Sequence, residues 1–289
     1  GLHARGWYRN VQPEIVEGYS TDLLAAEAIR LIKKRDPNRP IYLNLSFNAP
    51  HPVAQAPEAL ITKYAKLGFT GRMIAHAGAI DAMDSAIGRV LAVLEAEGMV
   101  GNTLVMFFCD NGSGGGGRSL RGISPKGGVG HLALRGGKGS VLEGGIRVPA
   151  VFRWPGVIRA GTTCSQLISA QDLFPTFAVA AGIKPANQKP FDGVNCWPAI
   201  IQNKLMKRPP VIVAGPSGDF AVLHDQWKLT WGQGQVSLYN VKDDPAESKD
   251  VILNHPETAA NLADALAPFS KLNMSNQERG ARQGGGRRP

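Results

Sequence analysis

The ten residues Thr103–Gly112 read Thr-Leu-Val-Met-Phe-Phe-Cys-Asp-Asn-Gly. The first seven are almost wholly apolar, which is typical of a strand buried on both faces of a sheet. Ligands of open α/β sheets bind outside the carboxyl ends of strands, so Asp110 and Asn111 are candidate oxygen ligands for a hard cation. Asp-Asn-Gly is also ordinary turn chemistry, and taken alone it indicates a turn more often than a metal site.

Helical and strand patterns alternate on both sides of this junction. They predict an α/β domain with a mostly parallel central sheet flanked by helices. We expect one helix at about residues 21–35 with Thr21 as its N-cap, and another at about 71–97 followed by Gly98. The expected core face of the second helix is a row of large apolar residues, Ile80, Met83, Ile87, Leu91 and Leu94.

A second strand is expected at Ile41–Phe47, where apolar and polar residues nearly alternate. The segment Asn48-Ala49-Pro50-His51-Pro52 follows, and its two prolines prevent the strand from continuing. His51 is therefore expected just past the carboxyl end of a strand. Taken alone, it could equally cap a turn.

Residues 114–140 are rich in glycine and lack periodicity, which predicts a long surface loop of the kind that bears functional residues. Such a loop suits an anionic ligand, although charged loops are usually only solvated. The glycines around Lys138 allow the backbone to approach another group closely. The basic or potentially basic residues of the loop are Arg118, Arg121, Lys126, His131, Arg135 and Lys138.

The remaining pattern predicts a smaller second domain. A helix at about 171–181 ends the large domain, and a link to about residue 190 follows. Short antiparallel strands are expected at 211–214, 220–223 and 227–231, then a helix at 256–269 with Leu262 and Leu266 directed inward. The predicted organisation is a large domain at 1–185, a small α+β domain at 186–272 and a disordered basic tail at 273–289.

Composition limits the classes of function. The chain has 289 residues, 43% of them hydrophobic and 19% charged, and we find no apolar run long enough to cross a bilayer. About a third of the net charge of +9 lies in the tail after Ser275, so nucleic acid is not an expected partner. Cys109, Cys164 and Cys196 include no Cys-x-x-Cys, so neither a zinc knuckle nor a disulfide framework is indicated.

Taken together, the motifs resemble the sulfatase family, an arylsulfatase-like group of the alkaline phosphatase superfamily. The family has Asp-Asn-Gly at a strand end and then Leu-Arg-Gly-x-Lys-x-x-x-x-Glu-Gly-Gly-x-Arg-x-Pro, and residues 134–149 fit that pattern throughout. The resemblance covers nearly everything from His51 to about Leu272. Further matching segments come in the family's order, including Ala49-Pro50-His51, Asp172-Leu173-Phe174-Pro175-Thr176, Gln226-Trp227-Lys228-Leu229 and Leu238-Tyr239-Asn240 with Glu247.

The resemblance implies an alkaline phosphatase-like fold and Ca²⁺-dependent hydrolysis of an aryl or carbohydrate sulfate ester. It makes Asp110 and Asn111 calcium ligands, and it gives Lys138 contacts to a sulfate oxygen and to the bridging oxygen of the ester. His51 takes the place of the histidine that contacts the leaving group. These residue types suit the chemistry, because breaking a sulfate ester develops negative charge that cations stabilise.

The resemblance also implies a nucleophile that this sequence does not contain. In the family it is a formylglycine made from the Cys or Ser of a Cys-x-Pro-x-Arg segment, and no such segment occurs here. We therefore expect a carboxyl-terminal part of a sulfatase that is inactive by itself. Two alternatives remain open: a phosphatase or phosphodiesterase of the same superfamily, and a non-catalytic protein that binds anions or sulfated glycans. The resemblance implies a periplasmic or secreted location, and no signal peptide is visible at the amino terminus.

Overall fold

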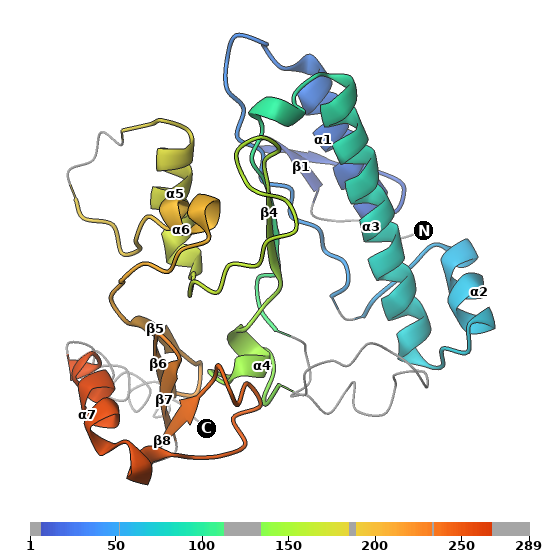
Figure 1. The fold of residues 1–289 in the computed structure, drawn as a ribbon. Helices are drawn as coiled ribbons and strands as arrows, with labels where there is room; N and C mark the ends of the chain where they lie inside the picture. The colour runs from blue at the N-terminus through green and yellow to red at the C-terminus, as the bar shows by residue number, and fades with distance from the viewer. Residues whose placement is uncertain (1–6, 52, 113–133, 185–188, 233, 268–289) are drawn as a thin grey trace, which may run out of the picture. The chain divides into compact units, whose positions relative to one another are not determined.

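The computed structural model describes residues 7–51, 53–112, 134–184, 189–232 and 234–267 (Figure 1). The chain divides into two compact units. The described residues up to Thr103 form the first unit, and those from Leu104 onward form the second. The expected tail at 273–289 lies outside the described residues, as do Arg118, Arg121, Lys126 and His131.

The first unit consists mainly of three helices. A short antiparallel hairpin precedes them, in which Trp7 pairs with Glu14. A 3-10 turn, Val100–Asn102, follows them. The elements are β1 (Trp7–Arg9), β2 (Gln12–Glu14), α1 (Ser20–Lys34), α2 (Glu58–Lys66) and α3 (Arg72–Ala96).

The two long helices of this unit pack through small residues. The predicted bounds of α1 and α3 are confirmed to within a residue, and Gly98 has the expected positive φ of 65°. The predicted core face of α3 is wrong at Ile80, which is 42% exposed, and confirmed at Leu94, while Met83, Ile87 and Leu91 are partly buried. Most of the fully buried residues of α1 and α3 are small, and small residues let helix backbones approach closely. The buried alanines are Ala25 and Ala28 of α1, and Ala79, Ala82 and Ala86 of α3.

Two local predictions in the first unit are wrong. Tyr19, not Thr21, is the N-cap of α1, and Thr21 is buried inside the first turn. The segment Ile41–Phe47 is not a strand in the structure. Its side chains alternate in exposure, but an alternating pattern reports only an extended backbone. A strand also needs a hydrogen-bonded neighbour.

The second unit begins with an antiparallel pair of strands, β3 (Val105–Phe108) and β4 (Ala150–Arg153). The prediction that β3 is buried on both faces is wrong, since Phe107 is 37% and Phe108 45% exposed. All strand pairs in the described ranges are antiparallel, so those ranges do not contain the expected parallel central sheet. A buried strand needs neighbours on both edges and cover on both faces, and β3 has one neighbour there.

The rest of the second unit agrees with most of the predicted elements. The helix near 171–181 and the three strands are confirmed. The last helix begins at Pro256 as expected but ends at Asp264, and the strand at 235–240 was not expected. 3-10 turns cover Ala170–Asp172 and Ile252–Asn254. The elements are α4 (Glu143–Ile146), α5 (Leu173–Ala180), α6 (Trp197–Gln202), β5 (Val211–Ala214), β6 (Phe220–His224), β7 (Trp227–Gly232), β8 (Gln235–Asn240) and α7 (Pro256–Asp264).

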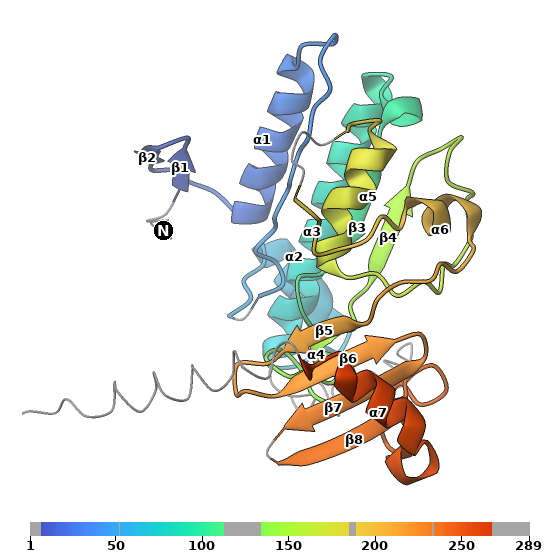
Figure 2. The same ribbon diagram turned by 90° about the vertical axis from the view of Figure 1, so that its left-hand side faces the viewer.

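Strands β5 to β8 form an antiparallel sheet in chain order that is covered on both faces. Helix α7 lies across one face (Figure 2). The opposite face packs against Val141, which precedes α4. The α7 face buries Val222, Leu229, Leu238, Leu262 and Leu266, and the opposite face buries Val211, Ala221 and Leu223.

The segment Asp172–Thr176, which matches a family motif, has a structural role. The Asp172 side chain is fully buried and pairs with Arg208 at 2.6 Å. It also accepts hydrogen bonds from the backbone N–H groups of Ser169 and Val194. Asp172 thereby joins the start of α5 to two distant segments.

No helix in the described ranges is long and apolar enough to cross a membrane. Cys109, Cys164 and Cys196 are free thiols.

Candidate active site

Asp110, Asn111 and Gly112 form a turn directly after β3. The backbone N–H of Asn111 donates to Asp110 Oδ1 at 2.9 Å, and the Asn111 side-chain amide donates to the Gly112 carbonyl at 2.9 Å. Asp110 is exposed and Asn111 is partly buried. These bonds leave the Asp110 Oδ2 and Asn111 Oδ1 atoms without a donor among the described residues. The two residues can therefore offer oxygen atoms to a ligand.

The turn is packed against a second segment, Arg135–Arg147, which we call the lysine loop. The Gly112 N–H donates to the Gly145 carbonyl at 2.9 Å. A Cβ atom on Gly112 would overlap the Gly144 carbonyl oxygen, so no larger residue fits there without movement. The structure therefore brings the two strongest motifs of the sequence, Asp-Asn-Gly and the lysine motif, into direct contact.

The lysine loop is tightly wound. Gly136 and Gly139 have φ of 80° and 85°, which glycine adopts far more readily than other residues. The Gly144 N–H donates to the Arg135 carbonyl at 2.7 Å, and this bond closes the loop. Lys138 lies in the exposed turn between the two positive-φ glycines. The glycines were expected to let the backbone approach another group closely. In the structure, the backbone of the loop approaches its own other end and Gly112.

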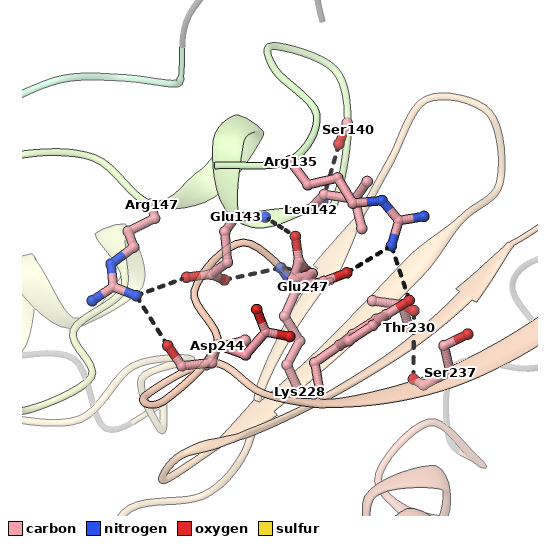
Figure 3. A network of polar contacts seen from close by, with 12 residues as sticks. Arg135, Ser140, Leu142, Glu143, Arg147, Lys228, Thr230, Ser237, Asp244 and Glu247 are labelled. Atoms are coloured by element: carbon pink, nitrogen blue, oxygen red, sulfur yellow. Dashed lines mark hydrogen bonds and ion pairs between the residues drawn. The ribbon is translucent and has the colours of Figure 1, made fainter. Parts of the chain in front are cut away.

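A buried ionic network joins the lysine loop to the small sheet (Figure 3). The Lys228 ammonium donates to Glu143 Oε1 at 2.9 Å and lies 2.9 Å from Glu247 Oε1. The Glu143 N–H donates to Glu247 Oε2 at 2.8 Å. The side chains of Lys228, Glu143 and Glu247 are 0%, 4% and 0% exposed. Burial of three charges together requires this mutual pairing.

Arginines at the two ends of the lysine loop extend the network. Arg135 donates to the Tyr239 hydroxyl at 3.0 Å and to the Glu247 carbonyl at 3.1 Å. Arg147 donates to Glu143 Oε2 at 3.2 Å and to the Val241 carbonyl at 3.3 Å. Both ends of the segment that contains Lys138 are therefore fixed to strand β8 or to residues just after it.

His51 belongs to the first unit, in a segment that we call the histidine loop (residues 48–51 and 53–56). Its backbone N–H donates to the Asn48 carbonyl at 2.9 Å, and its side chain is exposed. The Tyr19 hydroxyl donates to the Gln55 carbonyl at 2.9 Å. His76 of α3 donates to the Pro50 carbonyl, and partial burial lowers the pKa of His76.

The oxygen donors at Asp110 and Asn111 fit a hard divalent cation such as Ca²⁺, which prefers carboxylate and amide oxygens. Within the described ranges, no group of three or more His, Cys, Asp or Glu residues is arranged to hold a metal ion. Ca²⁺ takes six to eight oxygens, so Asp110 and Asn111 could supply only two of them.

Sequence reasoning missed the residues that hold the lysine loop in place. Glu143, Arg147, Lys228 and Glu247 matched family segments but were given no role. A usable signal was present at Trp227-Lys228-Leu229, where alternation places a lysine on the sheet face opposite Leu229. A lysine in the middle of a strand that is covered on both faces requires buried acidic partners.

A protein-family model described as Sulfatase matches residues 3–183. The chain belongs to the sulfatase family. The family resemblance is therefore confirmed, whereas the roles of Asp110, Asn111, Lys138 and His51 stay predictions.

The chain is similar to several named sulfatases. It is 32% identical over 217 residues to N-acetylgalactosamine-6-sulfatase of Homo sapiens, covering 74% of this chain and 39% of that protein. It is 36% identical over 188 residues to steryl-sulfatase of Mus musculus, covering 63% of this chain and 28% of that protein.

A solved structure is also similar: the crystal structure of Ps i-CgsB in complex with k-i-k-neocarrahexaose. Its TM-score is 0.80 and its identity 31%, with 90% of this chain and 57% of that chain covered. The chain spans about two fifths of the length of the N-acetylgalactosamine-6-sulfatases that it matches, 40% and 39%.

Proposed function

We propose that the full protein containing this chain hydrolyses sulfate esters with the help of Ca²⁺. The observation that supports this most directly is the packing of Gly112 on the lysine loop, with the Gly112 N–H bonded to the Gly145 carbonyl at 2.9 Å. This packing holds the Asp110 and Asn111 oxygen atoms and the exposed Lys138 ammonium group on two segments that contact each other. Membership of the sulfatase family supports the same reaction.

Each proposed site residue has a distinct task. Asp110 and Asn111 hold the cation, which when bound supplies positive charge to the sulfate oxygens. Lys138 contacts a sulfate oxygen and the bridging oxygen, and its charge stabilises the alkoxide that develops as the ester bond breaks. His51, when protonated, donates a hydrogen bond to the same leaving oxygen.

We propose that the nucleophile lies in a part of the full protein outside this chain, because no Cys-x-Pro-x-Arg or Ser-x-Pro-x-Arg occurs here. On this proposal the 289-residue chain alone does not hydrolyse sulfate esters. The same proposal accounts for the exposure of β3 and β4, whose Phe108 and Val151 are 45% and 58% exposed. Further strands at the edges of a mostly parallel sheet, and helices over its faces, would bury them.

We propose a sulfated carbohydrate as the substrate class. Two similar proteins support it: one is named for a sulfated aminosugar, and the other was solved with a neocarrahexaose. We also propose export from the cytoplasm, as the family resemblance implies.

The test uses the full protein with its upstream segment. We expect sulfate release from a sulfated oligosaccharide or an aryl sulfate, loss of activity after treatment with a calcium chelator, and recovery when Ca²⁺ is added back. The corresponding phosphate ester is the comparison substrate. Faster release of phosphate than of sulfate would favour the phosphatase alternative and contradict the proposal.

A further inference from the structure

We infer that Lys228, Glu143 and Glu247 are positioning residues, which hold Lys138 and the Asp110–Gly112 turn in the arrangement needed for hydrolysis. This inference rests on the proposed function. It gives the small antiparallel sheet a defined part in the chemistry, through a buried lysine that does not touch substrate.

Lys138 depends on its loop for its position. The residue is exposed, and within the described ranges its side chain has no ion pair or hydrogen bond. The backbone of the lysine loop therefore decides where the ammonium group lies. That backbone is attached to the sheet at Arg135, Glu143 and Arg147, three to nine residues from Lys138 in sequence. These attachments are the means by which the sheet determines the geometry of the loop.

Lys228 lies at the centre of the contacts that attach the lysine loop to the small sheet. It lies on β7 opposite Leu223 of β6 and Tyr239 of β8, so all three side chains are on the sheet face that meets the lysine loop. Glu247 Oε1 is buried and accepts no hydrogen bond with good geometry. The Lys228 ammonium at 2.9 Å is the charge that compensates it. Without Lys228, the carboxylates of Glu143 and Glu247 would be buried with no buried cation beside them in the described ranges.

A continuous set of contacts leads from Lys228 to both proposed functional elements. Lys228 orients Glu247, whose Oε2 accepts the Glu143 N–H at the start of α4. The next residues of α4, Gly144 and Gly145, bond to the Arg135 carbonyl and to the Gly112 N–H respectively. Displacement of α4 would therefore move the lysine loop and the Asp-Asn-Gly turn together.

A buried ion trio is weak evidence for stability, since apolar residues of similar size often replace such groups without loss. The directional hydrogen bonds of the trio contribute more to fixing one conformation of the lysine loop than to the stability of the fold. The inference therefore predicts a loss of loop order that goes beyond any general loss of stability.

The first experiment measures hydrogen–deuterium exchange in this 289-residue chain and in its Lys228→Met and Glu247→Gln variants. The reporters are the amides of Gly112, Gly144 and Gly145, and the reference amides are those of β6 and β7. We expect exchange at the reporters to rise about tenfold or more while the reference amides stay protected. The matched control is Arg208→Met, which breaks a buried ion pair of the same unit that does not touch the loop.

Reporter exchange in Lys228→Met no faster than in Arg208→Met would overturn the inference. If Lys228→Met unfolds the whole sheet, the reference amides also lose protection. The isosteric Glu247→Gln variant then decides: fast exchange confined to the reporters supports the inference, and unchanged exchange overturns it.

The second experiment uses the full protein and a double-mutant cycle. If Lys228 acts partly through Lys138, the Lys138→Ala/Lys228→Met double variant should lose less kcat/KM than the sum of the two single losses, whereas independent sites would give additive losses. The inhibition constant of inorganic sulfate should rise about tenfold in Lys228→Met, and this constant does not depend on the fraction of enzyme that is folded.

Additive losses, or an unchanged inhibition constant, would count against a positioning role. A wild-type full protein with no sulfatase activity would contradict the proposed function instead. The exchange experiment would still decide whether Lys228 orders the loop, so the two failures are distinguishable.

Discussion

The lysine loop presents the exposed Lys138 and the histidine loop presents the exposed His51, and the protein holds the two loops by different means. The lysine loop is fixed by buried charges, Lys228 with Glu143 and Glu247, and by positive-φ glycines. The histidine loop is held by single hydrogen bonds from Tyr19 and His76 to its backbone carbonyls. One loop depends on a network and the other on separate contacts.

This difference predicts different responses to mutation. Removing one member of a buried ionic network leaves the others uncompensated, so the loss is large and shared. Removing a single donor to a partly exposed carbonyl costs about 1 kcal/mol and stays local. The predictions below test this contrast, beginning with the largest expected effect.

Lys228→Met should lower the free energy of unfolding of the second unit by about 3–5 kcal/mol, because the buried Glu247 carboxylate loses its cation and Glu143 keeps only the half-exposed Arg147. Urea unfolding followed by tryptophan fluorescence measures the loss, since Trp227 and Trp231 lie on β7. The triple variant with apolar residues at 143, 228 and 247 should recover most of that loss. A single-variant loss below about 1 kcal/mol would show that the trio is not a network.

Gly112→Ala should destabilise the second unit by about 1–3 kcal/mol, because the added Cβ overlaps the Gly144 carbonyl. The control is Gly88→Ala in α3, where the Cβ meets nothing within 4 Å and should stabilise the helix by about 0.5–1 kcal/mol. Thermal unfolding of both variants gives the comparison. Equal effects would contradict the close packing of the turn on the lysine loop.

His76→Phe should cost about 1 kcal/mol, because the Pro50 carbonyl loses its donor while the ring volume is kept. The effect should be confined to the histidine loop, as measured by hydrogen exchange at the His51 amide. Faster exchange along the whole of α3 would show that His76 supports the helix more than the loop.

The His76 pKa is lowered by partial burial, so this residue should make stability depend on pH. In the acidic range the unfolded chain binds the proton more readily than the folded chain does. The free energy of unfolding should therefore fall as pH drops from about 7 through the ordinary histidine value of about 6.5 toward the lowered value. Urea midpoints at several pH values, in wild type and in His76→Phe, measure the contribution of this residue. An identical pH dependence of stability in wild type and in His76→Phe would show that His76 does not contribute to it.

The sequence alone predicted the elements that are determined by residues close together in the chain. The bounds of α1 and α3, the start of α7 at Pro256 and strands β5 to β7 follow from periodicity, proline and glycine. Predictions failed where a distant partner decides the outcome. Ile41–Phe47 lacks a neighbouring strand in the described ranges, and Ile80 of the predicted core face of α3 is exposed while Ala79 and Ala82 beside it are buried.

The candidate site shows the same division. Asp110, Asn111 and Lys138 could be identified because their motif is contiguous or nearly so in sequence. Their contact through Gly112 and Gly145 could not, because a hydrogen bond between residues 33 positions apart leaves no local pattern. The pairing of Lys228 with Glu143 was beyond reach for the same reason.

The most direct test of the proposed function compares two lysine variants of the full protein on a sulfate ester. Lys138→Ala should lower kcat/KM at least about a hundredfold, because the developing charge loses its ammonium partner. Lys204→Ala, an exposed lysine after α6, should leave kcat/KM within about twofold of wild type. Equal activity of the two variants would contradict the assignment of Lys138 and with it the account of the lysine loop.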